Sequence, residues 1–154
     1  MKFAVDTGAL LSLSCSSYLP LILKHTSLIS TTAVSEELKH FAVYSDSLGK
    51  HAQQLLKELQ RRTIILEEPK ELLSLKISAA ELSVFSLGKE KKCTILTDDL
   101  HAARIAAQQL SLPSKPSFYV LLFLHKQQKI TKQQLILAID SIISQRNWMT
   151  GALY

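Results

Sequence analysis

The sequence predicts an α/β fold in which helices pack on both faces of a parallel sheet. Short apolar runs with β propensity alternate with segments that repeat apolar residues at helical spacing. The segments between these runs are roughly ten residues or longer, which is the length of a crossover between parallel strands. The chain has 154 residues, which suits one domain with one hydrophobic core. We therefore expect a single domain over residues 1–154, organised as a three-layer α/β/α sandwich.

Each expected strand is a short, mostly apolar run bounded by polar residues. The first begins at Lys2 and ends where Asp6 interrupts it. Because parallel strands are connected by right-handed crossovers, all of them should end at the same edge of the sheet. The strands are expected at Lys2–Val5, Ser27–Ser30, Thr63–Leu66, Lys92–Thr97 and Leu112–Lys115.

The helices are expected from apolar periodicity and from capping residues at their starts. Pro20 marks a break or restart in the first of them. Thr31 and Thr32 are N-cap candidates, and Ser78-Ala-Ala-Glu81 has the form of a capping box. The expected helices are Thr7 to about Lys24, Thr32 to about Tyr44, Asp46–Arg62, Ser78–Lys89, Leu100–Leu110, Ser117–Gln128 and Lys132–Arg146.

Composition and charge exclude several classes of protein. Hydrophobic residues make up 47% of the chain and charged residues 20%, which is typical of a globular protein rather than a disordered one. No window is apolar enough for a transmembrane helix, and the N-terminal region lacks the pattern of a signal peptide. The formal net charge of +5 is compatible with a polyanionic partner. Cys15 and Cys93 lack metal-ligand spacing, so we expect buried free thiols in a reducing compartment and a cytoplasmic protein.

Acidic residues gather where this architecture places a ligand site. Asp6 directly follows the first expected strand. The other candidates follow the fourth strand or lie in the first turns of helices, namely Asp98, Asp99, Glu36, Glu37 and Glu81. Parallel sheets bind ligands just outside the carboxyl ends of their strands. Mg²⁺ and Mn²⁺ prefer hard oxygen ligands, and converging carboxylates repel one another unless a cation neutralises them. This grouping is what a metal-assisted phosphodiester hydrolase requires.

Each acid taken alone also has a structural explanation. Asp98 is a suitable N-cap for the next helix, and Asp99 suits the positive end of that helix dipole. The capping box accounts for Glu81, and an early helical position accounts for Glu37. Asp6 is the hardest to explain structurally, because it follows an apolar strand and has no cationic neighbour in sequence. The metal site is therefore indicated by the joint placement of the acids.

Four segments of the chain together resemble a known family. They are FAVDTGALLSL at 3–13, TTAVSEELKHF at 31–41, ISAAELSVFSLGKEKKCTILTDDLHAARIAAQQL at 77–110 and KITKQQLILAIDSII at 129–143. They resemble PIN domains, most closely the small stand-alone prokaryotic kind related to VapC-type toxins. The resemblance implies a Rossmann-like topology, an acidic pocket for Mg²⁺ or Mn²⁺ and endoribonuclease activity on RNA. It also implies association as a homodimer or with a cognate antitoxin.

The resemblance assigns roles residue by residue. Glu37 matches the family's helix glutamate better than Glu36, which would point roughly 100° away on a helix. The expected catalytic and metal-binding acids are Asp6, Glu37, Glu81 and Asp98, with Asp99 as a further candidate ligand. Thr7 and Thr97 are expected to orient carboxylates through hydroxyl hydrogen bonds. Arg104 is expected to face the pocket and hold a carboxylate or a phosphate.

The sequence lacks the residues that other functional classes require. A receiver-type phosphoacceptor domain needs an aspartate after the third strand, where this chain has Glu67 and Glu68. A dinucleotide-binding fold needs a glycine-rich turn, and Gly8 stands alone. The alternative is a catalytically silent PIN-like module that binds RNA or protein, and the presence of every matched acid argues against it. A toxin role and an RNA-processing role both stay open.

Overall fold

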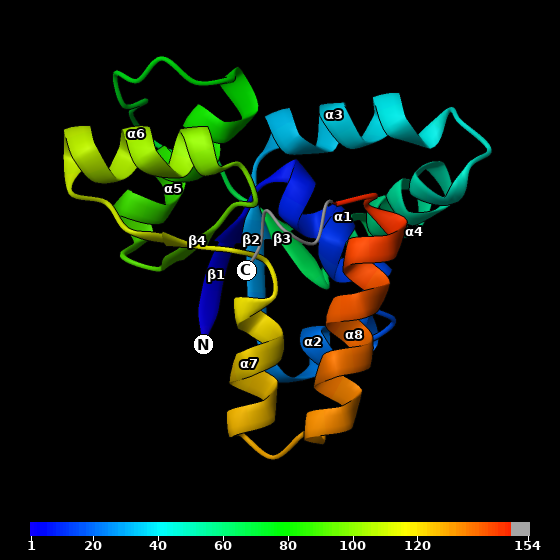
Figure 1. The fold of residues 1–154 in the computed structure, drawn as a ribbon. Helices are drawn as coiled ribbons and strands as arrows, with labels where there is room; N and C mark the ends of the chain where they lie inside the picture. Colours follow the sequence, from blue (N-terminus) through cyan, green and yellow to red (C-terminus); the bar gives the residue numbers. More distant parts are fainter. Residues whose placement is uncertain (149–154) are drawn as a thin grey trace.

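The computed structural model describes residues 1–148 and is organised around a five-stranded parallel sheet (Figure 1). Its strands are β1 (Lys2–Val5), β2 (Ser27–Ser30), β3 (Ile64–Leu66), β4 (Thr94–Leu96) and β5 (Ser114–Lys115). They pair in the order β3-β2-β1-β4-β5, and every pair is parallel. All the expected strands are present. β4 is shorter than expected because Lys92 adopts a left-handed φ of 54° that ends the preceding helix. The expected end of the domain at Tyr154 lies outside the described residues.

The helices occupy the expected segments, with one difference near the N-terminus. The expected helix from Thr7 to Lys24 forms two helices, and Pro20 lies in the first turn of the second, where its missing N–H has no helical partner to lose. The helices are α1 (Thr7–Cys15), α2 (Leu19–His25), α3 (Thr32–Ala42), α4 (Ser47–Gln60), α5 (Ala79–Lys91), α6 (Leu100–Leu110), α7 (Tyr119–Lys126) and α8 (Lys132–Gln145).

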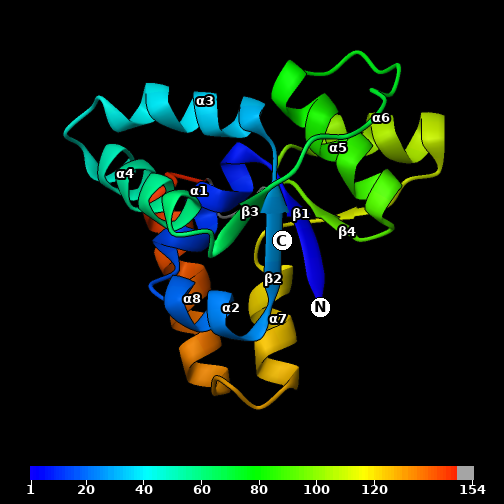
Figure 2. The same ribbon diagram turned by 180° about the vertical axis from the view of Figure 1, so that it is seen from behind.

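The strand order explains how the helices divide between the two faces of the sheet. From β1 through β2 to β3 the chain moves in one direction across the sheet, and from β3 to β4 and β5 it moves in the other. Right-handed crossovers in opposite directions place their helices on opposite faces. Figures 1 and 2 show α5 and α6 on one side of the strands, while α1 packs with α4 and α8 on the other. The predicted three-layer α/β/α sandwich is confirmed.

The core lies where both helical layers meet the central strands. Phe3 of β1 is fully buried and contacts the rings of Tyr119 and Phe123 edge to face, with centroids 6.2 and 6.3 Å away. Cys15 and Cys93 are free thiols; Cys15 is buried as expected, whereas Cys93 is only half-buried.

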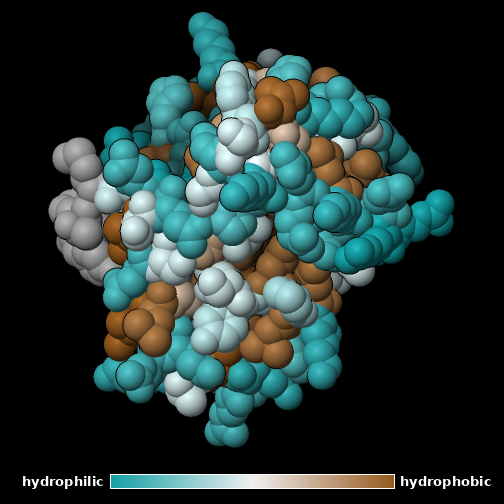
Figure 3. Space-filling model, turned by 90° about the vertical axis from the view of Figure 1, so that its right-hand side faces the viewer, coloured by the Kyte–Doolittle hydropathy of each residue, from teal (hydrophilic) through white to brown (hydrophobic). Residues whose placement is uncertain are grey.

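The face seen in Figure 3 is mostly hydrophilic, with smaller hydrophobic patches. No helix within residues 1–148 has the length and apolar character to cross a membrane.

Gly88 allows α5 to lie close to the sheet. A Cβ built at Gly88 would lie 2.3 Å from Ile95 Cγ1 and 3.4 Å from Ala4 Cβ. Gly88→Ala is therefore expected to lower the free energy of unfolding by about 1–3 kcal/mol through overpacking, as urea denaturation would measure. Gly8→Ala is the matched control, because its Cβ would meet no atom closer than 3.5 Å. That variant should be neutral or slightly more stable, and a Gly88→Ala protein as stable as Gly8→Ala would contradict the close-packing explanation.

Candidate metal centre

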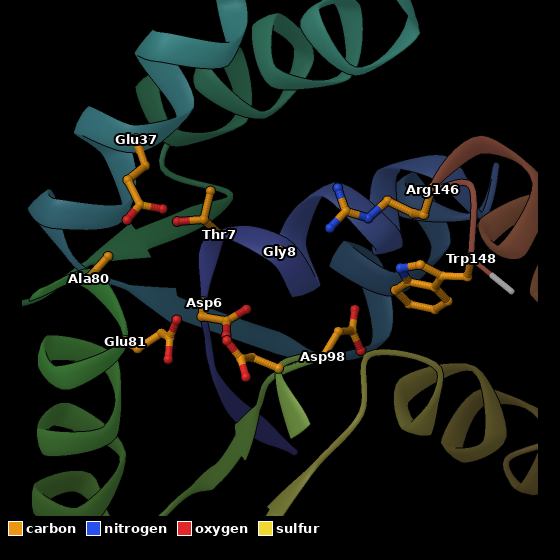
Figure 4. Close-up of a pocket in the computed structure, with 10 residues that line it drawn as sticks. Asp6, Thr7, Gly8, Glu37, Ala80, Glu81, Asp98, Arg146 and Trp148 are labelled. Atoms are coloured by element: carbon orange, nitrogen blue, oxygen red, sulfur yellow. The ribbon is translucent and has the colours of Figure 1, made fainter. Parts of the chain in front are cut away.

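A cavity of about 260 Å³ lies at the carboxyl ends of β1 and β4. The strand order reverses between these two strands, and open parallel sheets bind ligands at such a reversal. Figure 4 shows side chains from the β1–α1 junction, from α3 and α5, and from the segment after β4 gathered around this space. The lining residues are Asp6, Thr7, Gly8, Glu37, Ala80, Glu81, Asp98, Asp99, Arg146 and Trp148.

Asp6 is the most deeply buried acid of the cavity, with an exposed fraction of 4%. Its Oδ1 accepts a hydrogen bond from the Ala9 N–H at 2.8 Å, so Asp6 is also the N-cap of α1. Burial raises the pKa of Asp6 to about 7. Hydrogen bonds from Thr97 and Ala9 lower this pKa in part, and the negative charges of Asp98 and Glu81 raise it. The protein alone therefore stabilises the charged form of Asp6 poorly, and a cation in the cavity would stabilise it.

Two hydrogen bonds hold the Asp98 carboxylate in place. The Ser12 hydroxyl donates to Oδ2 at 2.8 Å, and the Ser117 backbone N–H donates to Oδ1 at 2.8 Å. Ser12 lies on α1 and Ser117 follows β5, so this carboxylate connects three separate parts of the chain. Neither serine can be distinguished in the sequence from the other serines, since Ser12 and Asp98 are 86 residues apart along the chain.

The N-cap of α6 is Asp99 rather than Asp98. Asp99 Oδ1 accepts a hydrogen bond from the Ala102 N–H at 3.0 Å, and its own backbone N–H donates to the Thr97 hydroxyl at 3.2 Å. The capping role that the sequence allows for Asp98 therefore belongs to the following residue. Asp99 is exposed but also lines the cavity, so both carboxylates after β4 reach it.

Glu37 and Glu81 reach the cavity from α3 and α5. Glu36 is exposed and pairs instead with Lys39, whose Nζ lies 2.9 Å from Glu36 Oε1. One residue along a helix turns the side chain by about 100°, which is why Glu37 lines the cavity and Glu36 does not. The Ser78 hydroxyl accepts the Glu81 N–H at 3.2 Å and caps α5, while the Glu81 carboxylate lines the cavity. Among the described residues the Ser78 N–H does not donate back to the Glu81 carboxylate, so the expected capping box is half formed and this carboxylate serves the cavity instead.

The donor chemistry of the cavity fits a divalent cation. Its carboxylates are the oxygen ligands that Mg²⁺ and Mn²⁺ prefer. Burial raises the pKa of Glu81, and the negative charges of Asp99 and Glu37 raise it further. The Thr7 hydroxyl lines the same cavity but is buried without a hydrogen-bond partner among residues 1–148, so the bond to a carboxylate that the sequence predicts for Thr7 is not present. In that part of the chain no three His, Cys, Asp or Glu side chains already stand in position to ligate one ion, so an ion would have to draw the carboxylates closer together.

Comparison with known families agrees with this arrangement. A family model described as a PIN domain matches residues 2–154. The chain belongs to the PIN-domain family. A search of curated proteins found no match. PIN domains are generally nucleases and typically use divalent metals, so the chain has a nuclease-type fold. The narrower relation to VapC-type toxins stays a prediction.

The residues expected to support the acids in this PIN domain differ in their positions. Thr97 is buried beside the acids, where its hydroxyl accepts the Asp99 N–H and lowers the pKa of Asp6. Arg104, by contrast, is exposed on α6 and is not among the residues that line the cavity. Ala102 and Ala106 of α6 are fully buried, and Arg104, two residues from each, lies about 200° around the helix from them. The expected contact of Arg104 with the pocket is therefore not present.

Arg146 and Trp148 complete the wall of the cavity, and the sequence did not mark them as site residues. Arg146 is the C-cap of α8, and its guanidinium carbon lies 6.0 Å from the centroid of the Trp148 ring. A Cβ built on Gly8 would lie 3.5 Å from Arg146 Nη2, so the guanidinium reaches the start of α1. Figure 4 shows the guanidinium and the indole on the side of the cavity opposite Glu37 and Glu81. A PIN-domain cavity lined by acids thus has one cationic and aromatic wall.

Proposed function

We propose that this PIN domain is a Mg²⁺- or Mn²⁺-dependent endoribonuclease that hydrolyses RNA phosphodiester bonds. The observation that carries the proposal is the buried Asp6 in a cavity lined by four further carboxylates, whose negative charges a divalent cation would neutralise. A bound divalent ion supplies a water of lowered pKa and stabilises negative charge on the phosphate. The residues proposed to hold the ion are Asp6, Glu37, Glu81 and Asp98, with Asp99 as a further ligand.

The protein's own residues position the reacting groups. Ser12 and Ser117 hold the Asp98 carboxylate in one orientation before any substrate binds, and the Ala9 N–H does the same for Asp6. A water molecule loses a proton to solvent and attacks the phosphorus in line with the leaving 3′ oxygen. The bond from phosphorus to that oxygen breaks and the oxygen takes up a proton, which leaves a 5′ phosphate and a 3′ hydroxyl. No side chain forms a covalent bond to the RNA, in keeping with the absence of an activated nucleophile motif in the sequence.

Cleavage of varied RNAs in Mn²⁺, in Mg²⁺ and in chelator tests the proposal. Asp6→Asn keeps the side-chain shape and an oxygen for the Ala9 N–H but removes the charge. The variant is expected to cut RNA at least ~100-fold more slowly, because changes next to a metal site already cost about 10–100-fold. Asp46→Asn is the control, since it makes the same change at the exposed N-cap of α4 and should cut like the wild type. A wild type that cuts none of the RNAs, or an Asp6→Asn protein that cuts equally fast, would contradict the proposal.

The narrower parts of the proposal rest on the family resemblance. They are a role as the toxin of a toxin–antitoxin pair, association as a homodimer or with the antitoxin, and a cytoplasmic location. A short overlapping reading frame directly upstream of the gene would favour the toxin role over a role in RNA processing. A protein that binds RNA and never cuts it would instead favour the catalytically silent module.

A further inference from the structure

Arg146 lines an acidic cavity without pairing to its acids. Within residues 1–148 its guanidinium forms no ion pair, although five carboxylates line the same space. Its Nε atom is buried and has no hydrogen-bond partner in that part of the chain. A buried donor without a partner destabilises the fold, so its retention points to a partner that binds later. The planar fork of a guanidinium matches the oxygens of a phosphate.

Hydrogen bonds hold the end of α8, and with it Arg146, against α1. Gln145 Nε2 donates to the Cys15 carbonyl oxygen at 3.2 Å, and the Ser141 hydroxyl donates to the same oxygen at 2.7 Å. The Gln145 side-chain oxygen lies 2.7 Å from His51 Nε2 on α4. These contacts fix the residue directly before Arg146 on two helices of the core. The guanidinium therefore enters the cavity from a rigid base.

Trp148 places an aromatic ring beside the arginine. The indole lines the cavity and is half-buried, and Figure 4 shows it next to Asp98. Aromatic side chains bind single-stranded nucleic acids by stacking on exposed bases, while arginine contacts the backbone phosphates. A base inside a duplex is already stacked on its neighbours and cannot stack on a side chain. The pair of side chains therefore matches an unpaired nucleotide.

We propose that Arg146 and Trp148 form the substrate-binding wall of the cavity and select single-stranded RNA. Arg146 binds a phosphate next to the acidic cluster, and Trp148 stacks against a neighbouring unpaired base. This inference rests on the proposed ribonuclease function and names two residues that determine how its substrate binds. It also gives the cavity two chemically distinct halves, an acidic half for a cation and a cationic, aromatic half for the nucleotide.

The binding experiment uses the fluorescence of Trp148, which is the only tryptophan of the chain. A single-stranded RNA of mixed sequence and about ten nucleotides is titrated into the full chain, once in Ca²⁺ and once in chelator. A perfect duplex containing the same strand is the comparison, and a gel confirms that the RNA stays intact. The single strand is expected to quench the emission and to bind at least ~10-fold more tightly than the duplex.

Variants separate the two contacts. Arg146→Ala is expected to weaken single-strand binding ~10-fold and to reduce the slope of log affinity against log salt by about 0.7, the effect of one phosphate contact. Arg146→Lys should keep that slope. Binding by Trp148→Ala is measured from the anisotropy of labelled RNA. This variant should bind at least about fivefold more weakly than the wild type, with an unchanged salt slope. Trp148→Phe should recover most of the lost affinity. Arg61→Ala is the control, because this exposed arginine follows α4 at the opposite edge of the sheet and should alter neither quantity.

The outcomes distinguish this inference from the proposed function. Equal affinity and equal salt slope in wild type and Arg146→Ala, or equal binding of single strand and duplex, would overturn the inference. RNA that is bound through Arg146 and Trp148 but never cut in Mn²⁺ or Mg²⁺ would support the inference and contradict the ribonuclease. Cleavage and binding that are unaffected by either variant would support the ribonuclease and contradict the inference. Circular dichroism confirms folding, and Arg146→Lys keeps the test decisive if Arg146→Ala does not fold.

Discussion

At about pH 8 and without metal, Asp6→Asn is expected to be more stable than the wild type by about 4 kcal/mol. Burial raises the pKa of Asp6 from 3.8 to about 7. Between pH 3.8 and about pH 7 the Asp6 carboxyl has released its proton in the unfolded chain but still binds it in the folded protein. The free energy of unfolding therefore falls as pH rises through this range. Asparagine has no charge to bury, and its oxygen still accepts the Ala9 N–H. The variant therefore avoids this loss of stability.

Urea denaturation in chelator at several values from about pH 4 to about pH 8 measures the effect. The difference between the two proteins should be small at the lowest pH and should grow until the pH passes the folded pKa of Asp6. Asp46→Asn is the control, because Asp46 is exposed and caps α4 by accepting the Gly49 N–H at 2.8 Å. It should change the free energy of unfolding by less than about 0.5 kcal/mol at every pH. A wild type as stable as Asp6→Asn at about pH 8 would show that Asp6 ionises without cost, which would remove the argument for a cation.

The acidic cluster could be predicted from the sequence because parallel topology relates position along the chain to position in space. Asp6 directly follows β1, and Asp98 is separated from the end of β4 by one residue. These two strands are neighbours in the sheet. Residues that follow paired parallel strands must lie at the same edge. The distinction between Glu36 and Glu37 needed only the angular step of a helix. These predictions depend on regular geometry, which sequence periodicity reveals.

Other features of the site depend on how side chains pack, which periodicity does not reveal. Asp98 and Asp99 are both suitable N-caps in sequence, and the hydrogen bonds from Ser12 and Ser117 to Asp98 leave Asp99 to cap α6. The position of Arg146 depends on the packing of α8 against α1, which no local pattern specifies. A sequence that meets the topological rules thus predicts the acids of the cavity but not its cationic wall.

The misplacement of Arg104 has a simpler physical cause. An arginine shortly after the acids suggests a partner for them, but the helix that carries it must bury its own small apolar face. Ala102 and Ala106 are four residues apart and both fully buried, so they define the face of α6 that packs inward. Arg104, midway between them, is directed to solvent. The hydrophobic pattern of α6 therefore decides the orientation of Arg104, and the pattern was present in the sequence.

Adding Mn²⁺ at about pH 8 is expected to remove most of the stability advantage of Asp6→Asn over the wild type. An ion that binds only the folded protein stabilises it by about 4 kcal/mol at a free concentration ~1000-fold above its dissociation constant. For a protein of this size that raises the Tm by roughly 8–16 °C. The wild type should show this increase, because the ion stabilises the charged carboxylates of Asp6 and Glu81, whose pKa values are raised by burial first and by neighbouring negative charges second. Asp6→Asn has lost the most buried of the proposed ligands and should gain far less.

Thermal denaturation with increasing Mn²⁺ measures this difference, and Asp46→Asn should follow the wild type at every concentration. Equal stabilisation of wild type and Asp6→Asn would mean that the ion binds at a different place. The direction of the change matters more than its size, because the same carboxylate must destabilise the protein without the ion and be required for its stabilisation by the ion. A residue kept only to cap α1 would show neither effect, since asparagine caps equally well. The two stability experiments together therefore separate a metal ligand from a structural aspartate without any assay of RNA cleavage.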